Sequence, residues 1–403
     1  MEYDDERIKK SGIDPKRFRK IQSWRYEAKE VQSANRLEMA IDQDFYDGDQ
    51  WTEADKSELA ERGQAPLVFN IIKQSINWVV GTERRARVDF NVYPRGQEDR
   101  KLAEAKTKMM KYDSDVNRVP FARSRAFKEA IVSGVGWLED GARNDETDEV
   151  AYSRTESWRN IWYDHLAQEP DLSDGRYLFR ERWTDLDVAI AMFPKHEEFL
   201  EKQSLAHDLN GTDDDEFFYS SFYSETDKTG RSIRGYSHYD HDTLNTNDRR
   251  KRVRLIEAWY REAATIKIMR GDEPFKGLDY DENNEDMVSA VENGTVSLFD
   301  ATVMRPRVMV MTEGFPLFDG PSPYRHHKFP FTPIWAYRRG RDGTPYGLVR
   351  DARVPQEDLN KRHSKSLHIL SSTTVIADED AFDSSDKWSD AEEELGRPDA
   401  IIR

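Results

Sequence analysis

The sequence predicts an α+β protein in which long helices are joined to groups of strands. One observation is a stripe of apolar or small residues between positions 14 and 45, which recur about every 3.4 residues, as on one face of a helix. Another is the pair of strand-like runs VRLIEAWY (253–260) and VMRPRVMVMT (303–312). A third is a second long helical pattern at 347–370. Both kinds of element are therefore expected in one chain.

The N-terminal part of the chain is predicted to be mainly helical. Pro15 suits the first turn of the first long helix, and Gly48 ends that helix. Helices are expected at 14–45, 66–81, 97–117 and 121–133. Between the second and the third, the alternation of Val88, Phe90 and Val92 predicts a strand at 85–93 with one buried face.

The next part is predicted to contain short strands, loops and one short helix. Residues 134–137 (GVGW) mark a turn into a strand. The aromatic stretch 151–184 is interpreted as strands and loops. A helix at 185–193 is expected to end before Pro194.

A reversal of charge separates this part from a basic one. From 207 to 248 the chain holds ten acidic and three basic residues and few aliphatic ones, which is typical of a linker or a solvated loop. Residues 249 to 270 contain eight basic residues and only two acidic ones. The two strand-like runs can pair across a polar, turn-rich insertion, so 249–337 is predicted to be a small β-rich module.

The helix predicted at 347–370 combines a thin apolar side with a basic face. The residues of the basic face are Lys361, Lys365 and His368. Pro355 requires that the helix either begin or kink close to it. A strand is expected at 373–377, followed by an acidic tail.

Composition and charge limit the classes of protein that remain. The 403 residues carry 61 basic and 78 acidic side chains, a net charge of −17, which argues against a protein that coats DNA by bulk attraction. Only 37% of the residues are hydrophobic, yet ten tryptophans argue against general disorder. Such a chain is expected to be extended, or to bury surface against copies of itself.

Several chemical classes are excluded by what the sequence lacks. It has no cysteine, hence no disulfide, thiol nucleophile or cysteine-bound metal, and a reducing cytoplasm is the expected compartment. No apolar run is long enough to cross a membrane. The motifs of P-loop ATPases, dinucleotide-binding proteins, zinc proteases and serine hydrolases are missing. We therefore predict no catalytic site, no cofactor and no metal site.

Three groups of acidic residues are candidate exceptions to that prediction. His238 and His241 with their neighbouring aspartates, and the acidic run 213–216, lie in the acidic linker and lack the spacing of a known metal site. Asp171 and Glu181 resemble the carboxylates of a metal-dependent nuclease, although an arginine stands where a lysine is expected. A solvated loop is the simpler interpretation for the first two groups.

A basic cluster between 338 and 368 holds eight cationic residues against four acidic ones. It could contact DNA phosphates without reading bases. Alternatively, Glu357–Lys361 and Asp358–Arg362 are ordinary helix pairs, which would leave Arg353 and Lys365 without an obvious partner. The sequence leaves both interpretations open. The candidate DNA-contacting residues are Arg350, Arg353, Lys361, Arg362 and Lys365.

The stretch YGLVRDARVPQEDLNKRHSKSLHIL (346–370) resembles a block of the portal proteins of short-tailed bacteriophages. Two other stretches, 162–183 and 45–51 followed by 66–72, are similar to the same family, with His165 and Gly175 as departures from it. Within the block, the residues at matching spacing are Gly347, Arg350, Asp351, Pro355, Gln356, Asn360, Lys361, Arg362, Ser364, Leu367 and His368.

The resemblance implies a ring-shaped homo-oligomer, typically of twelve subunits, at one vertex of the capsid in the virion, assembled in the host cytoplasm. Double-stranded DNA would pass through its channel without sequence recognition. Terminase, capsid or scaffolding proteins, and tail or head-completion proteins would bind it. Channel-lining bases would be few, since a passage should not grip DNA.

The resemblance also implies a division of the chain into a helix-rich wing, an acidic linker, a β-rich stem or clip module at the narrow motor-facing end, and a tunnel helix. Because portal subunits are generally longer, the C-terminal crown is expected to be missing. The alternatives are a metal-dependent nuclease or packaging enzyme, and another virion protein such as a tail adaptor. The expected boundaries are 1–205, 206–248, 249–345 and 346–403.

Overall fold

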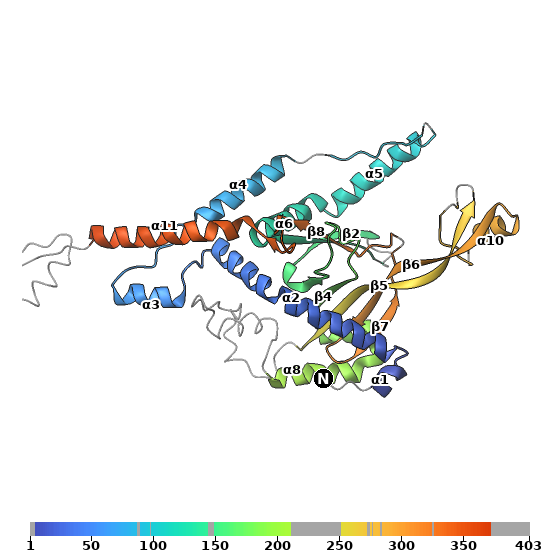
Figure 1. The fold of residues 1–403 in the computed structure, drawn as a ribbon, viewed down its shortest axis with the longest axis horizontal. Coiled ribbons are helices and arrows are strands. Elements are labelled where there is room, and N and C mark those ends of the chain that lie inside the picture. The colour runs from blue at the N-terminus through green and yellow to red at the C-terminus, as the bar shows by residue number, and fades with distance from the viewer. Residues whose placement is uncertain are drawn as a thin grey trace, which may run out of the picture.

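The computed structural model describes helices and antiparallel sheets, which confirms the α+β class (Figure 1). The acidic run 213–216, His238, His241 and the strand expected at 373–377 lie outside the described residues. The described residues are 5–86, 89–96, 98–143, 149–210, 251–271, 275, 277–282, 284–324 and 326–371.

The first long helix is confirmed as α2 (Pro15–Asp47), after the short α1 (Asp5–Lys10). The Asp14 side chain accepts a hydrogen bond from the Lys16 N–H at its start, so one free donor of the first turn is satisfied. At its end Gly48 has a φ of 109°, a left-handed conformation that glycine adopts without strain.

The next helices are α3 (Glu53–Glu61), α4 (Ile71–Arg85), α5 (Arg100–Val116) and α6 (Val119–Ser133). The limits predicted for α4, 66–81, are wrong. The helix begins later, because the Asn70 side chain caps the Lys73 N–H at 2.9 Å, and it continues through Gly81.

The strand predicted at 85–93 is also wrong, since none of the described residues 89–94 joins a sheet. The segment instead runs beside α5, where the Val92 N–H donates to Thr107 Oγ1 at 3.0 Å. An alternating pattern can therefore mark an extended segment that lies along a helix.

One sheet has three antiparallel strands in the order β2 (Ala151–Glu156), β1 (Val135–Ala142) and β8 (Phe331–Trp335). The strand expected after residues 134–137 is thus confirmed as β1. Its partner β8 comes from nearly 200 residues later in the chain, about the length of an ordinary domain.

The other large sheet has five strands in sequence order: β3 (Ile161–Tyr163), β4 (Tyr177–Asp185), β5 (Arg252–Gly271), β6 (Val296–Met311) and β7 (Pro316–Pro321). The predicted pairing of the two strand-like runs is confirmed, with register from Ile256–Met311 to Gly271–Val296. The distal half of this hairpin projects from the body and carries α10 (Glu285–Glu292) (Figure 1).

Two helices follow β4 and cover the start of this sheet. The first, α7 (Leu186–Met192), ends just before Pro194, as predicted. The second, α8 (Glu197–Asn210), was not predicted. Strands β4 and β5, which precede and follow the acidic linker in the chain, pair in one sheet. The domain boundary expected at 206–248 stays a prediction.

The last described helix, α11 (Leu348–Ser371), confirms the helix predicted at 347–370. It follows the small pair β9 (Tyr337–Arg338) and β10 (Pro345–Tyr346). Pro355 lies inside the helix and does not start it.

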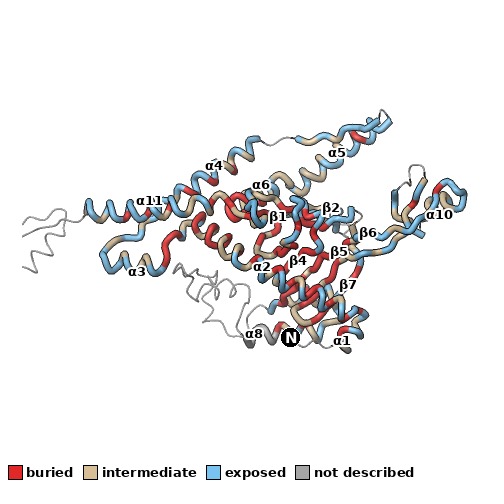
Figure 2. Tube along the Cα trace, viewed as in Figure 1, coloured by how far each residue is buried: buried red, intermediate tan, exposed pale blue. Residues whose placement is uncertain are grey.

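Most buried apolar residues of the described chain form two clusters, and α2 contributes to both. Phe18 and Ile21 pack under the five-stranded sheet with Phe179 and Ile256. The other end of α2, with Ile41 and Phe45, packs with residues of α4, α6, β1 and the start of α11. Figure 2 shows buried residues concentrated there, whereas α3, α5, α10 and the distal end of α11 are largely exposed.

Candidate functional site

The best-defined polar site is the contact that fixes α11 on the body. The start of α11 lies close to the end of α6. A Cβ on Gly347 would lie 2.2 Å from the Val132 carbonyl oxygen, so only glycine fits there. Val349, in the same turn, is fully buried. Both residues belong to the stretch that resembles portal proteins.

Asp42 on α2 receives two arginines from α11. Arg350 Nε and Nη2 lie 3.0 and 2.9 Å from its Oδ2, and Arg353 Nε lies 3.2 Å from its Oδ1. Arg350 also donates to Asn35 Oδ1 at 2.7 Å, and Arg353 pairs with Glu38. The expectation that Arg353 lacks a partner is therefore wrong.

Burial raises the pKa of Asp42 to about 6, although Arg350 and Arg353 act to lower it. Since the Asp42 side chain has no exposed surface, its charge depends on those two arginines for compensation. The two guanidinium groups join α11 to α2, and the Arg350 and Arg353 side chains are only 13 and 15% exposed.

Three polar side chains at four-residue intervals form a ladder on α11: Gln356, Asn360 and Ser364, all buried. They face the extended segment 67–71, which precedes α4. The acceptors Ser364 Oγ, Asn360 Oδ1 and Gln356 Oε1 take the N–H groups of Leu67, Phe69 and Ile71 at 3.2, 3.0 and 3.2 Å.

The ladder works because two periods nearly agree. Four residues of helix rise about 6.0 Å, and two residues of extended chain rise about 6.6 Å, so every second N–H meets every fourth side chain. Gln356 also donates to the Phe69 carbonyl at 2.6 Å, and Asn360 donates to Gln50 Oε1 at 2.6 Å. Local sequence does not reveal this role, because the apolar spacing at 66–72 also fits a helix.

The remaining basic candidates, Lys361, Arg362 and Lys365, are exposed on the same helix. Arg362 forms the expected pair with Asp358 at 2.9 Å. Lys361 Nζ lies 3.8 Å from Asp55 of α3. The structure thus divides the five candidate residues into two that bind α2 and three that face outward.

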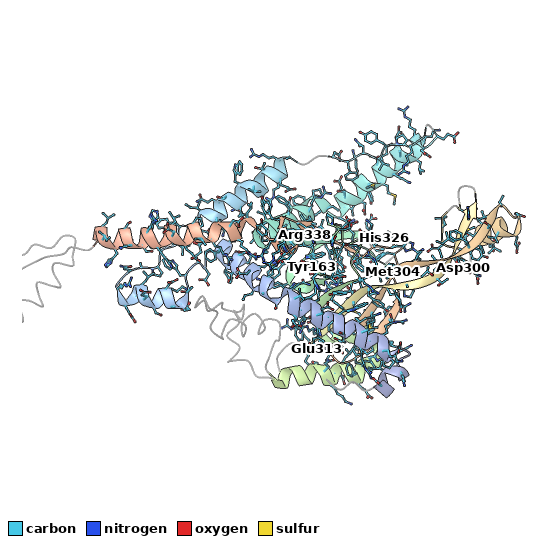
Figure 3. All side chains as sticks on the ribbon, in the orientation of Figure 1. Tyr163, Asp300, Met304, Glu313, His326 and Arg338 are labelled. Atoms are coloured by element: carbon cyan, nitrogen blue, oxygen red, sulfur yellow. The ribbon has the colours of Figure 1, made fainter. Side chains whose placement is uncertain are left out.

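The two carboxylates that resembled a nuclease pair have separate structural roles. Glu181 is buried with Arg25 Nε at 2.7 Å, Lys29 Nζ at 2.9 Å, and Arg254. Burial opposes its ionisation, but these three cations hold the pKa of Glu181 well below its usual range. Glu313, near α2 in Figure 3, lies 3.4 Å from both arginines.

Asp171 lies on an exposed turn, where it accepts from the Ser173 N–H and from Lys328 Nζ at 2.9 Å. Hydrogen bonds from these two residues lower its pKa to about 2. Within the described residues, no group of His, Asp and Glu side chains could hold a metal ion. No described helix is long and apolar enough to cross a membrane.

These contacts are structural: the charged groups described above join helices and strands to one another. The model of the phage P22-like portal protein family matches residues 22–403, so the chain belongs to that family. The resemblance found in the sequence is thereby confirmed, and the match also spans 206–300, where no family motif was recognised. The comparison with curated proteins gives no match.

Membership has direct consequences. The family is a structural one, of phage proteins that serve in DNA packaging and lie at the portal vertex of the virion. It implies assembly with copies of the chain and with capsid, terminase and tail proteins, and an encounter with DNA.

Proposed function

We propose that this protein is the subunit of a ring, of about twelve copies on the family pattern, through which double-stranded DNA enters and leaves the capsid. The observation that carries the proposal is the family match over residues 22–403. The low share of hydrophobic residues and the several exposed apolar side chains support the ring, since neighbouring subunits would cover those side chains.

The outward face of α11 is the proposed DNA-facing surface, with Lys361, Arg362 and Lys365. All three side chains are exposed, whereas Arg350 and Arg353 are mostly covered and pair with Asp42. A few cations on a chain of net charge −17 would touch phosphates in passing without holding the duplex.

The β5–β6 hairpin is the proposed motor-facing end, where terminase docks. Its distal half stands away from the two core clusters and exposes apolar side chains such as Phe299 and Met304. Replacing residues 272–295 with a short turn should weaken terminase binding and leave ring formation intact. Unchanged binding would refute this assignment.

Ring formation is the direct test of the proposed function. Mass photometry and negative-stain microscopy of the full-length protein should show closed rings of uniform mass. A species that stays monomeric across salt and protein concentration would count against the proposal.

A further inference from the structure

Helix α5 carries an apolar stripe that nothing in the described structure covers. Within this fully described helix, only Ala103 is buried. Leu102, Met109, Tyr112 and Val116 are 54, 74, 58 and 44% exposed. With Ala105 they follow a spacing of three and four residues, which is the seam by which one helix packs on others.

A groove elsewhere on the same chain offers the matching surface. It lies between α4 and α11, has a volume of about 380 Å³, and is almost wholly apolar. Ile71, Ser75 and Val79 line one side, and Leu348, Ala352, Pro355 and Leu359 line the other. A third helix would complete this two-helix surface.

The charges beside the stripe and beside the groove are complementary. Lys101 and Lys108 are exposed and seven residues apart, so they form one line beside the stripe. Asp351 and Asp358 are also exposed and seven residues apart, beside the groove, and Asp358 in addition pairs with Arg362 of its own helix. Seven residues of helix rise about 10.5 Å in both cases, so the two lines have the same spacing.

We propose that α5 of one subunit packs into the groove between α4 and α11 of the next subunit. This inference rests on the proposed ring and names a contact that would build it. In Figure 1, α5 and the groove lie on different parts of the molecule, with α5 at the upper right and the two helices of the groove at the left. A contact between two different patches leaves the groove of one copy and the stripe of the other free for further copies, as a ring requires.

Cysteine cross-linking tests the contact directly, because the chain contains no cysteine of its own. Met109→Cys places a thiol on the stripe and Ser75→Cys places one in the groove. A mixture of the two single variants, treated with a short bismaleimide, should give one cross-linked dimer. The variant with both substitutions should give a ladder of oligomers, and each single variant alone should give no product.

A second measurement uses charge within the stripe. Met109→Glu should weaken subunit association by at least about tenfold, because it would bury an unpaired carboxylate. Met110→Glu is the matched control, because Met110 is exposed on the same helix about 100° away from the stripe, and it should assemble normally.

The outcomes separate this contact from the ring itself. Rings without any Met109–Ser75 product would overturn the contact and leave the proposed function standing. Products from Met109→Cys alone would also overturn it, since they would mean that α5 pairs with α5. A protein that forms no rings but gives the mixed dimer would support the contact and count against the ring.

Discussion

Arg350 on α11 and Asp42 on α2 join the two longest described helices through a buried ion pair, with Nη2 2.9 Å from Oδ2. The two residues are 308 positions apart in the chain. The pair therefore fixes the end of the described chain to its beginning, and with it the direction in which the basic face of α11 points.

Removing one arginine should loosen α11. Arg350→Met would leave the buried Asp42 carboxylate without one of its two cations, and the free energy of unfolding at pH 7 should fall by about 3–5 kcal/mol. Urea denaturation measures this change. The control Arg362→Met breaks an exposed pair and should cost under about 1 kcal/mol. Equal effects would show that the buried pair has no special weight.

The polar ladder can be tested with two serines on one helix. Ser364→Ala removes the acceptor of the Leu67 N–H and should cost about 1 kcal/mol of unfolding free energy. Ser366→Ala, two residues on and exposed, should change it by less than about 0.5 kcal/mol. Denaturant unfolding of both variants in parallel measures the two free energies. Indistinguishable curves would contradict a stabilising role for the Ser364 hydrogen bond.

Glu181 should stabilise the protein at neutral pH and lose that effect in acid. Its pKa in the folded state lies well below the unfolded value, so its contribution is full above about pH 4.5 and declines as the pH falls further. Glu181→Gln should therefore lower the melting temperature at pH 7, with a difference from wild type that narrows towards pH 3. A difference in melting temperature that stays constant from pH 7 to pH 3 would contradict a lowered pKa for Glu181.

The ionisation of Glu129 on α6 should affect stability in the opposite direction, so that stability falls as the pH rises. Burial raises its pKa to about 7, against the effects of Arg125 and Arg159, and its Oε2 has no hydrogen-bond partner among the described residues. The folded state then binds the proton more tightly, so stability falls as the pH rises from about 4.5 through 7. Glu129→Gln should raise stability at pH 8 by on the order of 2 kcal/mol and change it little at pH 4.

Charge reversal on α11 separates DNA passage from assembly. Lys361→Glu with Lys365→Glu should reduce packaged DNA several-fold while rings form normally. The matched control, Lys195→Glu with Lys202→Glu, makes the same charge change at exposed positions near α7 and on α8 and should package as wild type. Packaging that is insensitive to the first variant would mean that these lysines are ordinary surface charges.

Sequence reasoning predicted the elements whose periodicity is long and regular. The stripe from 14 to 45 gave α2, and the two strand-like runs gave the β5–β6 pair. It misplaced α4 because the apolar residues at 67–71 fit a helix as well as an extended segment. The choice was decided by acceptors on α11 almost 300 positions away, at Gln356, Asn360 and Ser364.

The candidate site was predicted in part. The helix expected at 347–370 and its exposed pair Asp358–Arg362 both followed from local spacing. The pairing of Arg350 and Arg353 with Asp42 could not be predicted, because it depends on the tertiary packing of α2 and α11. A basic residue in a cluster carries no local sign of which way it faces.

The ladder between α11 and residues 67–71 ends at Ser364. Its hydrogen bonds from the N–H groups of Leu67, Phe69 and Ile71 are 3.2, 3.0 and 3.2 Å long, so the two segments keep the same spacing along the whole ladder. Between Lys365 and Leu370, no described side chain of α11 is buried. The direction of this end of the helix is therefore set by Gln356, Asn360 and Ser364, and because none of these three side chains titrates, a change of pH would leave the anchor unchanged.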